Sequence, residues 1–96
     1  MVTKIGIIVD RFLAVSVFAK VVEQGSFARA AERLAMSTSA ISRHVADLEA
    51  HLETRLLNRT TRRLSLTETG QAFFERCVQL LVEFAKALDK GDYAHW

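Results

Sequence analysis

The chain has 96 residues, a length that fits one small domain. Half of the residues are apolar and none is proline, which favours long helices over a turn-rich β-sandwich. The single cysteine, Cys77, excludes an internal disulfide and a cysteine-based zinc site, and it fits a reducing cytoplasm. Near the start, the longest apolar stretch runs only from Ile7 to Val9, too short for a signal peptide or a membrane span. We therefore expect a soluble, mainly α-helical, cytoplasmic protein.

The net charge of +2 is small, but the charges are unevenly distributed. Residues 1–67 hold ten Lys or Arg and six Asp or Glu, whereas residues 68–96 hold three and five. The first part of the chain is therefore the candidate for binding a polyanion.

The first predicted helix begins at Asp10, a good N-cap residue, and ends at Gly25. Apolar side chains recur at helical spacing between these two residues. Residues 1–9 show no interpretable pattern, and we assign them as an N-terminal extension.

Two further helices follow, each preceded by a serine that can cap it. Ser26 precedes a short helix with a predicted inward face of Phe27, Ala30, Ala31 and Leu34, which ends near Ala35 or Met36. Ser37 precedes a helix that runs to Glu53. Its apolar stripe consists of Ile41, Val45, Leu48 and Leu52.

The apolar period changes after Glu53. Leucines at 56, 57, 64 and 66 flank the polar segment 58–63, which predicts a two-stranded hairpin, or wing.

Thr67 then caps a long last helix that runs to about Lys90. Its apolar residues form two adjacent seams, Phe73, Cys77, Leu80, Phe84 and Phe74, Leu81, Leu88. Because three short helices cannot cover so wide a stripe, we assign these residues to dimerisation. The predicted divisions are a domain at 10–67, a linker helix at 68–90 and a tail at 91–96.

Two short helices joined by a tight turn are the layout in which the second helix enters the DNA major groove. With the apolar stripe buried, the first two turns of the helix after Ser37 present outward four side chains that can hydrogen-bond, Thr38, Ser39, Ser42 and Arg43. Arg43 can donate two hydrogen bonds to guanine. An ordinary solvated face is the alternative. The absence of any acidic residue between positions 33 and 46 favours DNA.

The wing provides a second signal. Four arginines, at positions 55, 59, 62 and 63, lie between Glu53 and Glu68 with no acidic residue among them. Arginines on a hairpin can neutralise phosphates or enter a narrow minor groove. The alternative is a basic loop that serves solubility.

The chain resembles the DNA-binding domains of LysR-type transcriptional regulators from Asp10 to about Lys90. The matching pieces are VFAKVVEQGSFARAAERLAMSTSAISRHVADLEAHLETRLLNR and TTRRLSLTETG. The order of GSF, AAERL, SAISRHVADLE and RRLSLTETG is specific, whereas each piece alone is weak.

The resemblance implies a winged helix-turn-helix followed by a linker helix that pairs two subunits on an interrupted dyad of double-stranded DNA. A full-length protein of this kind can form a tetramer and carries an effector-binding domain, so we expect no small-molecule effector site in this chain. Carried over position by position from the family, the base-reading residues would be Thr38, Ser39, Ser42, Arg43 and, on the wing, Arg62. The phosphate-binding residues are Ser26, Ser37, Arg59 and Arg63.

Three departures from the family pattern involve four positions. Thr38 and Ser39 replace a common Gln-Pro pair, and Leu57 replaces a usual phenylalanine as a smaller plug under the wing. Thr54 stands where a glycine usually ends the helix, so we expect the exit to avoid a left-handed turn or to be strained.

An enzyme would need a cluster of reactive side chains, and the only close titratable group is His44, Asp47 and His51. A solvated or DNA-facing surface explains these residues better. We therefore expect no catalysis, cofactor or bound metal, and no membrane partner. A winged-helix module that binds proteins or dimerises without DNA is the alternative function.

Overall fold

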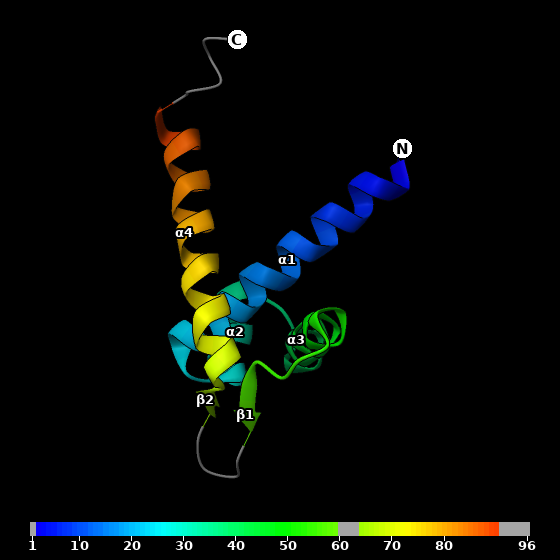
Figure 1. Cartoon of the computed structure of the whole chain (residues 1–96), viewed down its shortest axis with the longest axis vertical. Helices are drawn as coiled ribbons and strands as arrows, with labels where there is room; N and C mark the ends of the chain where they lie inside the picture. Colours follow the sequence, from blue (N-terminus) through cyan, green and yellow to red (C-terminus); the bar gives the residue numbers. More distant parts are fainter. Residues whose placement is uncertain (1, 60–63, 91–96) are drawn as a thin grey trace.

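The computed structural model describes the backbone of residues 2–59 and 64–90, and their side chains except those of residues 2–5, 7–9 and 90. Helices form most of the domain, and one small hairpin projects from it (Figure 1). The elements in chain order are α1 (Val2–Gln24), α2 (Phe27–Leu34), α3 (Thr38–Leu52), β1 (Leu57–Arg59), β2 (Leu64–Leu66) and α4 (Glu68–Lys90). The predicted class, a mainly helical winged helix-turn-helix with a long last helix, is confirmed.

Helix α1 starts eight residues earlier than the sequence predicts. Asp10 lies inside the helix and does not cap it, because α1 already begins at Val2. The segment from Val2 to Val9 contains no proline and a single glycine, so nothing in it breaks the helix before Asp10. The predicted end is correct, because Gly25 takes a left-handed conformation with a φ of 69°. No helix within residues 2–59 and 64–90 is long and apolar enough to cross a membrane.

Serine caps set the starts of α2 and α3, as predicted. The Ser26 hydroxyl accepts a hydrogen bond from the backbone N–H of Arg29 at 3.2 Å. The Ser37 hydroxyl accepts one from the N–H of Ala40 at 3.1 Å. Each cap satisfies an N–H group that has no partner within its helix. The turn between the helices is tight because Ala35 takes a left-handed conformation directly after α2.

The core lies where α1, α2 and α3 meet under the wing and the start of α4. The predicted inward face of α2 is confirmed, since Ala30 and Ala31 are buried while Phe27 and Leu34 pack partly against the core. Leu52 does not complete its stripe. It is 36% exposed because it is the last residue of α3, whereas the other three members of the stripe, Ile41, Val45 and Leu48, are buried.

The exit from α3 does make a left-handed turn, which we expected from the sequence to be either avoided or strained at Thr54. Glu53, and not Thr54, takes this conformation, with a φ of 53°. The N–H of Glu53 and that of Thr54 bond back to carbonyls of the last turn of α3, those of Ala50 and Glu49. A glycine-type helix end therefore forms on a glutamate, one residue ahead of the expected position.

The wing is an antiparallel hairpin in which Leu57 pairs with Leu66 and Arg59 with Leu64. Its connecting residues, 60–63, lie outside the described residues. Leu57 is buried beneath the hairpin. A hollow of about 140 Å³ remains beside it, bordered by Val22, Gly25, Leu57, Leu64, Ser65 and Leu66.

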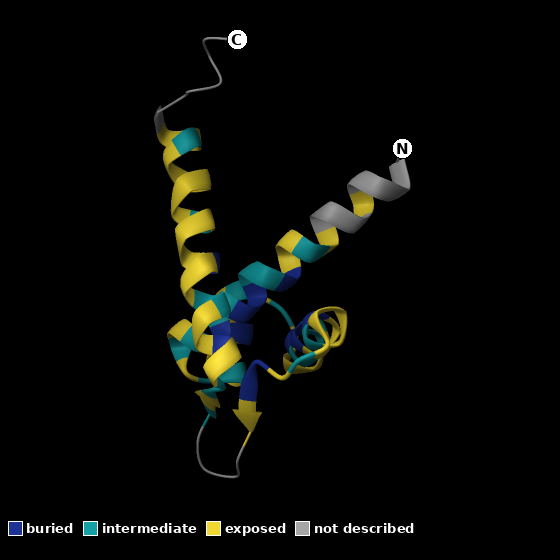
Figure 2. Ribbon diagram, viewed as in Figure 1, coloured by how far each residue is buried: buried dark blue, intermediate teal, exposed yellow. Residues whose placement is uncertain are grey.

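Helix α4 is anchored at its start and extends beyond the core. The Thr67 hydroxyl caps it by accepting a hydrogen bond from the N–H of Gly70 at 2.9 Å. Phe73 and Phe74 pack on Phe18 of α1, with ring centroids 5.7 and 6.3 Å away. Cys77 is buried next to them, and burial raises the pKa of its thiol above the usual 9.0. These three residues of the seams assigned to dimerisation therefore pack in the core of one copy instead. Beyond Cys77, α4 diverges from α1 and is mostly exposed (Figure 2).

Candidate nucleic-acid interface

The first two turns of α3 present the predicted polar face to solvent. Ile41 and Val45 are completely buried, and their burial fixes the rotation of the helix about its axis. Thr38, Ser39 and Arg43 are consequently exposed, and Ser42 is partly exposed. The structure thus brings together, at one end of α3, the four side chains of this helix that are predicted to read bases.

The same end of α3 favours anions. Unpaired backbone N–H groups and the helix dipole give the N-terminus of a helix a partial positive charge. Ser37 is exposed there. Because its hydroxyl oxygen accepts the capping bond, its own O–H group is still a donor that could bind a phosphate. Ser26 has the same chemistry at the start of α2 and is partly exposed.

Two of the predicted wing residues, Arg62 and Arg63, lie outside the described residues. Arg59 ends strand β1, and its guanidinium lies over the ring of Phe27 at 5.1 Å from the centroid. Its Nη2 atom lies 3.5 Å from a carboxylate oxygen of Glu49. A guanidinium has five N–H donors, so these contacts leave donors for a phosphate.

Glu49 is the residue of this region that the sequence did not single out. Its carboxylate accepts hydrogen bonds from the backbone N–H groups of Leu56 and Leu57 at 2.8 and 3.2 Å. A pattern of apolar periodicity cannot reveal such a contact, because the partners are backbone groups seven and eight residues away. The only signal in the sequence is an acidic residue beside the buried Leu48.

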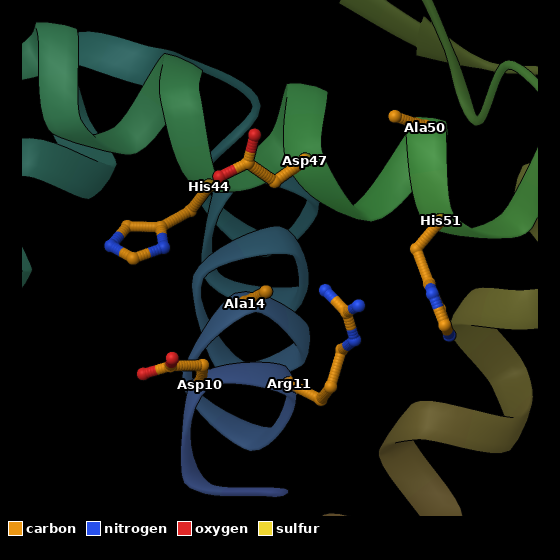
Figure 3. Close-up of a pocket in the computed structure, with 7 residues that line it drawn as sticks. All are labelled: Asp10, Arg11, Ala14, His44, Asp47, Ala50 and His51. Atoms are coloured by element: carbon orange, nitrogen blue, oxygen red, sulfur yellow. The ribbon is translucent and has the colours of Figure 1, made fainter. Parts of the chain in front are cut away.

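The titratable group noted on α3 lines an open hollow of about 560 Å³ between α1 and α3. The titratable side chains that line this hollow do not converge. His44 and Asp10 lie toward one side of it, whereas Arg11 and His51 lie toward the other (Figure 3). Among the side chains that the structure describes, no three His, Cys, Asp or Glu groups could hold a metal ion together.

A comparison with protein-family models matches residues 12–71 to the bacterial regulatory helix-turn-helix proteins of the lysR family. The chain belongs to this family. The match covers α1 from Phe12 through α2, α3 and the wing to the start of α4, and so includes the whole candidate interface of this LysR domain.

Its curated relatives are transcriptional regulators. The domain is 58% identical over 72 residues to the regulator CrgA of Neisseria meningitidis, an alignment that covers 75% of this chain and 24% of CrgA. It is 53% identical over 72 residues to the transcriptional repressor PA14_22550 of Pseudomonas aeruginosa, which covers 75% of this chain and 23% of the repressor. The LysR domain thus spans about a quarter of the length of these relatives, whose function points away from an enzyme.

Solved structures of similar fold include domains bound to DNA. The DNA complex of the CbnR DNA-binding domain matches this LysR domain with a TM-score of 0.78 and 35% identity, covering 88% of this chain and 98% of that one. The complex of the BenM DNA-binding domain with catB site 1 DNA matches with a TM-score of 0.80 and 28% identity, covering 85% and 91%. The chain is therefore a LysR-type helix-turn-helix DNA-binding domain, as its sequence predicts.

Proposed function

We propose that this LysR domain binds double-stranded DNA in a sequence-specific manner, with α3 in the major groove and the wing in the minor groove. The observation that carries the proposal is the exposed polar face of Thr38, Ser39, Ser42 and Arg43 at the N-terminus of a helix whose rotation the core fixes. The DNA complexes of the CbnR and BenM domains support it. Binding to DNA in a bacterium implies a cytoplasmic location.

The proposed roles follow from the chemistry of each side chain. Arg43 donates two hydrogen bonds to guanine, and the hydroxyls of the same face bind other base edges. Arg62 reads the minor groove. Ser26, Ser37, Arg59 and Arg63 bind phosphates, which fix the register of the protein on the duplex but carry no sequence information.

The domain acts as a homodimer through α4. Leu80, Phe84 and Leu88 are 59%, 53% and 57% exposed, which leaves an apolar face that one copy does not cover. The ring of Phe12 meets that of Phe84 at 5.4 Å, so the apolar face continues onto α1. A second copy that packs there places the two α3 helices on one side of the duplex. In a full-length protein, the dimers can associate into a tetramer.

Replacing Arg43 by alanine tests the reading role. We expect Arg43→Ala to lose about 5- to 150-fold in affinity for a preferred duplex, because one bidentate contact to guanine discriminates by about 1–3 kcal/mol. Binding to random duplex should change much less. Fluorescence anisotropy on both duplexes at one salt concentration measures the two affinities.

The matched control is Arg76→Ala, which removes an exposed arginine from α4, away from the proposed interface. It should leave the preference between the two duplexes unchanged. An equal loss on all sequences for Arg43→Ala would mean that this residue contacts only phosphate.

A further inference from the structure

We propose that Glu49 is a positioning residue for DNA recognition, whose carboxylate fixes the wing at a set orientation to the reading face of α3. This inference rests on the proposed function, since it concerns how two DNA-contacting elements are held relative to each other. Glu49 itself contacts no base in this account.

The contacts of Glu49 span two elements. One carboxylate oxygen, Oε2, accepts hydrogen bonds from the N–H groups of Leu56 and Leu57, which lie at 2.8 and 3.2 Å. The other oxygen, Oε1, lies 3.5 Å from Nη2 of Arg59. Glu49 belongs to the last turns of α3, whereas Leu57 and Arg59 are the first and last residues of β1. A single side chain of α3 therefore contacts both ends of the first strand of the wing.

Burial strengthens the two hydrogen bonds to the backbone. The Glu49 side chain is only 14% exposed, and Leu56 and Leu57 are at most 1% exposed. Hydrogen bonds to an ionised carboxylate are shorter and about twice as strong as neutral ones, and they gain strength away from water. Loss of the acceptor would leave two N–H groups of a buried segment without their partner, which is costly.

Arg59 extends the link to a third element. Its guanidinium contacts Glu49 on one side and lies over the ring of Phe27, the first residue of α2, at 5.1 Å. The carboxylate thereby also orients an arginine that is proposed to bind a phosphate. β1 is thus connected to α3 through Glu49 and to α2 through Arg59.

The charge of Glu49 allows a positioning role to be told apart from simple repulsion of DNA. A negative charge near a DNA-facing surface repels phosphates, so its removal alone should strengthen binding to any duplex. If Glu49 positions the wing, removal of its charge should instead weaken binding to the preferred sequence. The two effects have opposite directions and can be separated.

The test compares Glu49→Gln with Asp47→Asn, which removes one negative charge from an exposed position two residues earlier on the same helix. Affinities are measured on a preferred and a random duplex at one salt concentration, well below the unfolding temperature of each variant. We expect Asp47→Asn to bind both duplexes as well as the wild type or better. We expect Glu49→Gln to lose roughly tenfold on the preferred duplex, because an amide replaces the charged acceptor.

A second variant separates charge from geometry. Glu49→Asp keeps the charge but shortens the side chain by one methylene, so it cannot maintain the same set of contacts. It should lose affinity for the preferred duplex as Glu49→Gln does. Wild-type affinity for the preferred duplex in both variants would overturn the proposal.

Sequence selection distinguishes positioning from a general loss of stability. We expect Glu49→Gln to select the wild-type bases under α3 but to lose preference at the flanking positions under the wing. Unchanged preference at the flanking positions would overturn the positioning role while the proposed function stands. If the wild-type domain selects no sequence at all, the proposed function fails, and this inference fails with it.

Discussion

Gly70 lies where the first turn of α4 passes over the backbone that leads into the wing. A Cβ atom at this position would overlap the carbonyl oxygen of Leu56 and lie 2.9 Å from its carbonyl carbon. The same carbonyl accepts a hydrogen bond from the N–H of Thr67 at 3.0 Å, which holds it in place against Gly70. The final glycine of the TETG motif is therefore required by a close approach of two backbone segments, and not by an unusual φ.

Gly70→Ala should lower the free energy of unfolding by about 1–3 kcal/mol, because the methyl group meets backbone that no side-chain rotation can move away. Thermal unfolding followed by circular dichroism measures the change. The matched control is Gly6→Ala in α1, where a Cβ atom meets nothing within 4 Å. Alanine there should leave stability unchanged or raise it by up to about 1 kcal/mol. Equal effects of the two substitutions would contradict the close approach at Gly70.

The starts and ends of the helices show which features local chemistry can predict. The caps at Ser26, Ser37 and Thr67 were predicted because each depends on one hydroxyl and an N–H group three residues away. The start of α1 was missed because Asp10 is a good cap only where the preceding residues are not helical. The left-handed Glu53 was also missed, because nothing local to a glutamate favours that conformation.

The candidate site also contains features that the sequence predicts and features that it does not. The reading face of α3 was predictable, since it is the complement of a buried stripe whose spacing is visible in the sequence. The contacts of Glu49 with the wing, and the stacking of Arg59 on Phe27, were not. They depend on how the chain folds back after α3, and no periodicity encodes that path.

Glu53→Gly should stabilise the domain by about 0.5–1 kcal/mol. Glycine relieves the strain of the left-handed backbone, and this gain exceeds the added freedom of the unfolded chain. Thr54→Gly is the matched control. Thr54 is not among the described residues with positive φ, so glycine there should cost about 0.4–1 kcal/mol. Chemical denaturation of both variants measures the difference, and a larger gain from Thr54→Gly would contradict the position of the turn.

For the whole molecule, the arrangement of α1 and α4 matters most. The two helices pack at the base of the domain and then diverge as two arms (Figure 1). An apolar hollow of about 220 Å³, bordered by Phe12, Val15, Leu80, Leu81 and the stem of Arg11, lies between them. One copy leaves this hollow and the outer part of α4 uncovered, which is the physical basis of the proposed dimer.

Leu80→Glu should convert the proposed dimer to a monomer, because it places a charge in the proposed apolar interface. The neighbouring Gln79→Glu introduces the same charge at an exposed position outside the two apolar seams, and it should remain dimeric. Sedimentation equilibrium at micromolar concentration measures both. A wild-type domain that sediments as a monomer would refute dimerisation through α4.

Selection of bound duplexes from a random DNA pool tests the central claim, sequence-specific binding by α3 and the wing, most directly. We expect two enriched half-sites in inverted orientation, with centres about 34 Å or a multiple of this distance apart. Affinity for the enriched sequence should fall with salt at a log-log slope of about −0.9 for each phosphate neutralised. A bound pool without any enriched sequence, with an affinity that salt leaves unchanged, would mean that α3 and the wing do not bind DNA sequence-specifically.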